Sequence, residues 1–175
     1  MTTQPPSPTV GTEPPVVVVG ADEQSDVEVD VDRWCRLAAA TVQDAGLRGE
    51  LTLTFVDRDE IAVLNEQHLG KPGPTDVLSF PLDADDRAIR ADDSVPVLLG
   101  DVVICPDVAR AQAPVHAGTL DDELALLVVH GTLHVLGHDH AEPDESATMR
   151  SKELELLVAH HWRGPQPAAF RQVQD

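Results

Sequence analysis

The stretch LDDELALLVVHGTLHVLGHDH, residues 120–140, runs from a long apolar segment into a group of histidines. Just before it, Thr119 forms with Asp122 the pattern of a capping box, which predicts the start of a helix. Gly137 is of the residue type preferred just beyond a helix C-terminus. The pattern therefore predicts one apolar helix over residues 120–136.

Three histidines in this stretch have the spacing of metal ligands. His130 and His134 are four residues apart, so they project from one face of the helix, about 6 Å from each other. Gly137 lets the chain fold back, which brings His140 round as a third ligand. Three neutral imidazoles leave one position open for water, as in catalytic rather than structural zinc sites. The spacing predicts one zinc ion per chain, with a water that can react at neutral pH.

The residues among these ligands distinguish the site from a protease. In metzincins the same histidine spacing carries a Glu after the first His, which serves as the general base. Gly131 occupies that position here, which argues against proteolysis. His138 lies outside the ligand spacing, and we expect it to pack against the site or support it. Asp139 is a candidate acceptor for a ligand N–H, or a proton acceptor near the water.

Outward from this stretch, short strand patterns alternate with helix patterns. Clean alternation over LTLTFV, residues 51–56, is typical of a half-buried strand. The segment GKPGPT, residues 70–75, cannot form regular structure. The other expected elements are strands at Val16–Val19, in DVLSFP (76–81) and in PVLLGDVVIC (96–105), a short helix beginning at Pro106, and helices from Asp30 or Asp32 to Ala45, from Asp57 or Asp59 to Leu69 and from Asp144 to His161.

The length of 175 residues fits one domain. Residues 1–15 hold five prolines and little apolar surface, so we expect a disordered tail. The aspartate-rich residues 83–94 are expected to form a solvated loop, and residues 163–175 a flexible C-terminal tail. The folded domain is accordingly predicted over residues 16–162.

Composition excludes several classes of protein. With 12 basic and 31 acidic residues the net charge is −19, which argues against nucleic-acid binding by bulk charge but not against local contacts. No run approaches 18 apolar residues, and the N-terminus lacks the pattern of a secretory signal. Cys35 and Cys105 have no metal or redox spacing, so we expect free thiols in a reducing cytoplasm.

Three segments together resemble the YbeY family of endoribonucleases, also called rRNA maturation factors. They are HGTLHVLGHDH, PGPTDVLSFP and LLGDVVICPDVA, and the likeness extends over residues 16–162. The resemblance implies an α+β fold with a small mixed β-sheet flanked by helices, and zinc on His130, His134 and His140. It also implies that the block around Thr75, Asp76, Ser79 and Phe80 forms one wall of the active-site cleft.

The resemblance implies a role in processing and quality control of ribosomal RNA in the bacterial cytoplasm. The expected partners are ribosomal RNA and small-subunit ribosomal proteins or an assembly GTPase. Many family members carry an Arg six residues before Thr75, thought to contact the RNA phosphate, but this chain has Leu69 there. Lys71, two residues on, could partly replace it as a point charge. We therefore take His130, Asp139 and Lys71 as the candidate catalytic residues.

Three functions are open from the sequence. The first is a zinc-dependent single-strand endoribonuclease. The second is a ribosome-assembly factor whose zinc is largely structural, which the absence of the Arg favours. The third is a metalloprotease, which the absence of a Glu at position 131 disfavours.

Overall fold

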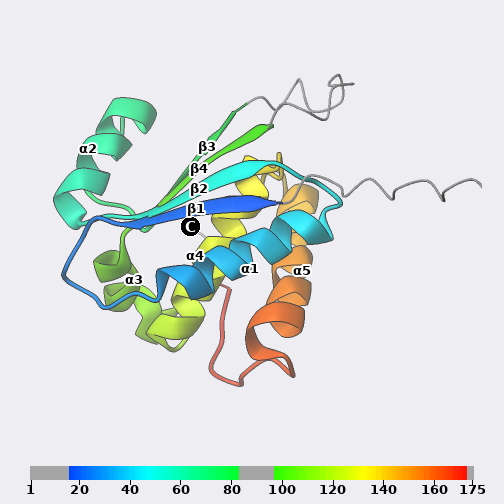
Figure 1. The fold of residues 1–175 in the computed structure, drawn as a ribbon. Coiled ribbons are helices and arrows are strands. Elements are labelled where there is room, and N and C mark those ends of the chain that lie inside the picture. The colour runs from blue at the N-terminus through cyan, green and yellow to red at the C-terminus, as the bar shows by residue number, and fades with distance from the viewer. Residues whose placement is uncertain (1–15, 83–96, 173–175) are drawn as a thin grey trace, which may run out of the picture.

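The computed structural model describes residues 16–82 and 97–172. The expectations of a disordered tail over residues 1–15 and of a solvated loop over 83–94 lie outside these ranges. The fold is α+β, with one mixed sheet and five α-helices among the described residues, as the sequence predicted (Figure 1).

The sheet has the strand order β1-β2-β4-β3. Strands β1, β2 and β4 run parallel, and β3 lies antiparallel to β4 at one edge. Their bounds are Val17–Asp22 for β1, Glu50–Phe55 for β2, Val77–Pro81 for β3 and Leu98–Ile104 for β4. All four overlap strand patterns in the sequence, and β1 extends beyond the predicted Val16–Val19.

Helices α1, α2 and α3 begin at the residues that predicted them, whereas α5 begins at Pro143, one residue before the predicted Asp144. Asp30 and Asp57 cap α1 and α2 with their side chains, and Pro106 occupies the first turn of α3. The bounds are α1 Val31–Asp44, α2 Arg58–Leu69, α3 Pro106–Gln112, α4 Leu120–Val135 and α5 Pro143–Leu156. A 3₁₀ turn, Ala113–Val115, follows α3, and a π-helical turn, Leu157–Trp162, extends α5. None of these helices is long and apolar enough to cross a membrane.

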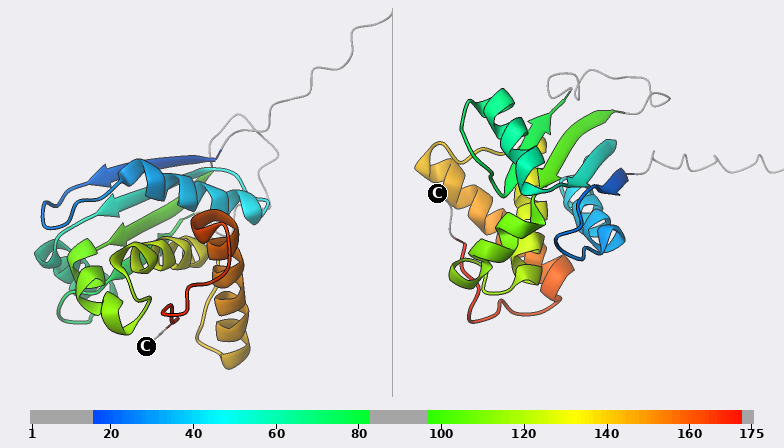
Figure 2. Two further views of the ribbon diagram at one scale, coloured as in Figure 1. Left: turned by 90° about the horizontal axis from the view of Figure 1, so that it is seen from below. Right: turned by 90° about the vertical axis from the view of Figure 1, so that its left-hand side faces the viewer.

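Helices α1 and α4 pack on one face of the sheet, with α5 beyond them (Figure 2). Leu51, Leu53 and Phe55 of β2 are fully buried on this face, as the alternating pattern predicted. The opposite face is covered near β3 and β4 by α2, whose Ile61 packs with Val103. The central position of α4 therefore places its C-terminal turn, which carries the histidines, beside β3 and β4.

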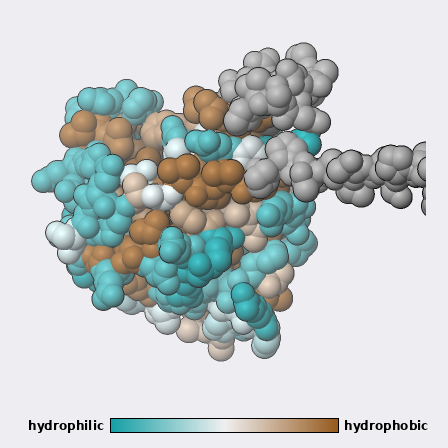
Figure 3. Space-filling model, viewed as in Figure 1, coloured by the Kyte–Doolittle hydropathy of each residue, from teal (hydrophilic) through white to brown (hydrophobic). Residues whose placement is uncertain are grey.

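The strand β1 forms the other edge of the sheet. It continues through Gly20, which we expected to end it. A Cβ at this position would lie 2.5 Å from atoms of Val31 and Cys35, so the glycine allows α1 to pack closely on the strand. Val17 and Val19 are about half exposed, and Figure 3 shows hydrophobic residues at the surface along β1.

Residues 163–172, the described part of the expected C-terminal tail, include a buried side chain. Phe170 is only 2% exposed, and its ring contacts that of Trp162 edge to face at 4.7 Å between centroids. The imidazole of His161, at the end of the predicted helix, donates to Asp122 at 2.8 Å. Asp122 therefore bonds this histidine rather than completing a reciprocal capping box with Thr119.

Candidate metal centre

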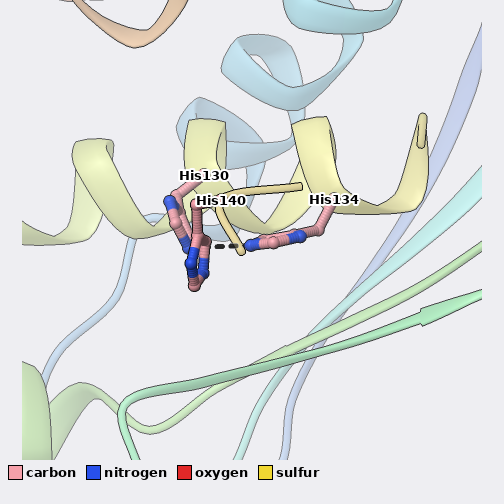
Figure 4. A group of neighbouring side chains, drawn as sticks. All are labelled: His130, His134 and His140. Atoms are coloured by element: carbon pink, nitrogen blue, oxygen red, sulfur yellow. Dashed lines mark hydrogen bonds between the residues drawn. The ribbon is translucent and has the colours of Figure 1, made fainter. Parts of the chain in front are cut away.

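The structure brings the three predicted histidines together at the end of α4 (Figure 4). One ring nitrogen from each of His130, His134 and His140 lies within 4.8 Å of the others. The Nε2 atoms of His130 and His134 are 3.1 Å apart. Two nitrogens bound to one zinc at tetrahedral angles are about 3.3 Å apart, so the arrangement already approaches that of a chelate.

A Schellman turn at Gly137 brings His140 to the helical pair. The N–H of Gly137 donates to the carbonyl of His134, and the N–H of His138 donates to that of Leu133, both at 3.0 Å. Gly137 has φ of 101°, in the left-handed region that favours glycine. The turn reverses the chain within three residues, as the sequence pattern predicted.

A buried carboxylate fixes the orientation of His130. Glu153 of α5 is fully buried, and its Oε1 lies 2.6 Å from the Nδ1 of His130. An ionised carboxylate can only accept, so Nδ1 of His130 is the donor and Nε2 keeps its lone pair toward the other histidines. Glu153 was not among the predicted site residues. Its signal was a charged residue on the helical face that also carries the buried Met149 and Leu156.

Close packing explains why glycine follows the first histidine. A Cβ on Gly131 would lie 2.7 Å from Val102 Cγ1 and 3.1 Å from Val77 Cγ2. The hydroxyl of Ser79 donates to the Gly131 carbonyl at 2.9 Å. Position 131 therefore faces the sheet rather than the histidine cluster, and it has no room for a glutamate side chain.

The environment of His134 favours the neutral imidazole that a metal ion needs. Burial and the neighbouring His130 and His140 lower the pKa of His134 to about 4. His134 is therefore neutral at pH 7, which is the form that binds a metal. Three convergent imidazoles, one of them held by a carboxylate, fit the donor set of a catalytic zinc ion.

The lowered pKa of His134 makes a prediction for the metal-free protein. In the unfolded chain this histidine takes up a proton below about pH 6.5, whereas the folded chain resists until about pH 4. Stability contributed by the neutral form is present above pH 6.5 and is lost as the pH falls toward 4. The melting temperature of the chelator-treated protein should fall over this window, and His134→Gln should show a shallower fall. An identical fall in both proteins would contradict this assignment.

The other predicted site residues lie around the cluster. Asp139 is exposed, and its Oδ1 accepts the backbone N–H of His140 at 2.7 Å, so it bonds a ligand's main chain rather than a ring. His138 lines an open hollow with residues of α5, among them Ser151 and Lys152. Its side chain is not part of the group of three ligand nitrogens.

Leu69, the last residue of α2, and Lys71, on the segment that follows the helix, are both exposed. Leu69 is 56% exposed, so it is not a core residue. The buried Asn65, which was not predicted to have a role, donates from its amide to the carbonyl of Gly73 at 2.9 Å. This bond fixes the Gly- and Pro-rich segment 70–75 against α2.

The second sequence block packs directly against the helix that carries the histidines. Ser79 of β3 bonds Gly131, as described above, and the ring of Phe80 contacts His68 edge to face. Asp76 accepts from the amide of Gln112 at 2.6 Å, and this amide also donates to the buried Glu123 of α4. The block thus connects β3 to α3 and α4 beside His130.

The match to known proteins covers most of the chain. Residues 20–161 match the family described as Endoribonuclease YbeY. The chain belongs to this family. A YbeY relative from Acidothermus cellulolyticus is 46% identical over 85% of this chain and 93% of its own length. One from Thermobifida fusca is 44% identical over 80% of this chain and 90% of its own.

A solved structure supports the assignment to the YbeY family. The solution structure of TM1509 from Thermotoga maritima is 27% identical and covers 83% of this chain and 91% of its own, with a TM-score of 0.57. The family resemblance expected from the segments HGTLHVLGHDH, PGPTDVLSFP and LLGDVVICPDVA is therefore confirmed.

Proposed function

We propose that this protein is a zinc-dependent, single-strand-specific endoribonuclease that acts in ribosomal RNA processing and ribosome quality control. Membership of the YbeY family supports the nuclease class, because the relatives carry the name Endoribonuclease YbeY. The observation that carries the proposal is the convergence of nitrogens from His130, His134 and His140 within 4.8 Å. Zinc bound there would act as a Lewis acid toward a phosphoryl oxygen and would lower the pKa of a water.

The residues of the chain divide the remaining work. Glu153 holds the proton on Nδ1 of His130 and so directs Nε2 toward the ion. Asp139 is an exposed carboxylate one residue from His140, and we assign it as acceptor of the proton that the attacking hydroxyl loses. Lys71, on the segment fixed by Asn65, supplies a cation for an RNA phosphate.

The close contact at Gly131 argues against a metalloprotease. That activity needs a glutamate base after the first histidine. Here a side chain at position 131 would collide with Val102 and Val77 of the sheet. Helix α4 therefore contacts β3 and β4 closely at Gly131. A general base for hydrolysis must come from another position.

Ribosomal RNA is the proposed substrate, in the cytoplasm, with small-subunit ribosomal proteins or an assembly GTPase as partners. The net charge of −19 supports dependence on a partner, because RNA phosphates are repelled by most of such a chain. Local cations and the zinc site would then provide the direct contacts with the RNA.

Cleavage assays on metal-stripped protein test the proposal. Single-stranded RNA and a duplex of the same sequence are incubated with the protein before and after chelation, and after return of Zn²⁺, Mn²⁺ or Mg²⁺. We expect cleavage of the single strand alone, loss on chelation and recovery with zinc. Cleavage that survives complete removal of metal would overturn the zinc dependence. A zinc-loaded protein that binds ribosomal particles but cleaves no RNA would instead be an assembly factor with a structural ion.

Lys71→Ala should weaken RNA cleavage about fivefold, because one exposed ion pair contributes about 1 kcal/mol. Its zinc content should stay unchanged. Lys152→Ala is the matched control, because Lys152 is the other lysine of the chain and pairs with Asp44 on α1. Equal loss of cleavage in both variants would remove Lys71 from the site.

Leu69→Arg should strengthen RNA binding, since it restores the fork of donors that many YbeY proteins carry at this position. No loss of stability is expected because Leu69 is already exposed.

The salt dependence of RNA binding tests how many cations contact the RNA. With so few contacting cations, the logarithm of the affinity of the unmodified protein should fall with the logarithm of the salt concentration at a slope of only about 1 to 3. A slope near 10 would indicate a broad basic interface and contradict this picture.

A further inference from the structure

The carboxylate that orients His130 is itself held from the C-terminal segment. Both oxygens of Glu153 are engaged: Oε1 lies 2.6 Å from His130 Nδ1, and Oε2 accepts from the amide of Gln172 at 2.8 Å. The same amide nitrogen of Gln172 donates to the carbonyl of Arg150, one turn earlier in α5, at 3.0 Å. The side chain of Gln172 is thus fixed at two points of α5.

The segment that carries Gln172, residues 166–172, is anchored independently of this bond. Phe170 is buried against Trp162, as described above, and the N–H of Arg171 donates to the carbonyl of His116 at 3.2 Å. A Cβ on Gly118 would lie 3.2 Å from Ala169, so the segment also packs closely on the loop before α4. In Figure 2 it turns back from the end of α5 toward this loop.

We propose that Gln172 is a positioning residue of the metal centre. Its amide holds the carboxylate of Glu153, and that carboxylate in turn orients the imidazole of His130. This inference rests on the zinc site of the proposed function and adds the C-terminal segment to it. A fully buried carboxylate depends on its hydrogen bonds to keep one orientation, because water cannot replace them easily. Without the amide, Glu153 can rotate, and His130 is then less well aligned toward His134 and His140.

Zinc affinity measured without RNA tests the inference. Gln172→Met keeps the length of the side chain and removes the donor, and Gln166→Met is its matched control. The amide of Gln166 bonds only within the segment in the structure described, to the carbonyl of Phe170 at 3.3 Å. Competition with a chelator should show zinc bound at least about threefold more weakly by Gln172→Met, against the ~10–100-fold typical for loss of a direct ligand partner. Gln166→Met should bind zinc as the unmodified protein does.

A second set of variants distinguishes positioning from simple stabilisation of the fold. Glu153→Met removes the carboxylate that accepts from Gln172. The double variant Glu153→Met, Gln172→Met should therefore bind zinc with the same affinity as Glu153→Met alone. The metal-free melting temperatures of Gln172→Met and Gln166→Met should agree.

The inference is overturned if Gln172→Met binds zinc as tightly as the unmodified protein, or if Gln166→Met is weakened equally. It is also overturned if the losses in Gln172→Met and Glu153→Met multiply in the double variant. Failure of the unmodified protein to bind zinc would overturn the proposed metal site as well. By contrast, a zinc-binding protein that cleaves no RNA would overturn only the nuclease proposal.

Discussion

Replacing His130 or His134 by alanine is expected to remove the bound zinc and to lower cleavage of single-stranded RNA at least about 100-fold. Each substitution deletes one of three convergent nitrogens and leaves two, which cannot hold the ion in a site open to water. Elemental analysis of the purified variants measures the zinc, and a single-turnover cleavage assay measures the rate. His140→Ala should have the same effect, because the Schellman turn directs this imidazole to the helical pair.

His138→Ala is the matched control for these variants. It removes an imidazole from the same turn, but one that lines the hollow beside α5. Its zinc content and cleavage rate should remain near those of the unmodified protein. Full retention of zinc by His140→Ala would remove His140 from the ligand set, and loss of zinc from His138→Ala would add a ligand that the geometry does not contain.

Gly131→Ala should destabilise the protein by about 1–3 kcal/mol. In an ordinary helix interior the same change would stabilise by about 1 kcal/mol, because alanine is the better helix former. The sign reverses here because the added Cβ would lie 2.7 Å from Val102, a fully buried side chain of β4. Urea denaturation of the two proteins measures the difference in the free energy of unfolding.

Gly131→Glu, which restores the protease pattern, should cost about 4 kcal/mol or more, since it also buries a charge without a partner. Gly164→Ala is the control, because its nearest atom would be 3.9 Å away and no change in stability is expected. A stable Gly131→Glu variant with proteolytic activity would refute our explanation of this glycine.

Local signals predicted most of the fold because they act over a few residues. Asp57 caps the start of α2 with its side chain, and Gly70 ends the helix in a left-handed conformation. Both effects depend only on neighbouring residues. Strand order depends on long-range contacts, and nothing in the sequence distinguishes β1-β2-β4-β3 from other orders. Gly20 illustrates the difference: a glycine reads as a strand end, but here it provides space for α1 to approach.

The candidate site also combines residues that local spacing predicted with residues that it did not. The group of His130, His134 and His140 was predictable because its members lie within eleven residues and on one helix and its turn. Glu153 and Gln172 reach the same centre from 23 and 42 residues further along the chain. Their roles follow from the packing of α5 and of the C-terminal segment, which a spacing pattern does not contain.

The Schellman turn has a consequence for the kinetics of metal exchange. His130 and His134 are both carried by α4. His140 is joined to the helix through the turn, so its nitrogen could detach by movement of residues 137–140 alone. A bound ion would therefore leave most readily by first losing His140, while the two helical histidines would still hold it. The rate of exchange would then be set by the opening of the four residues 137–140 rather than by melting of the domain.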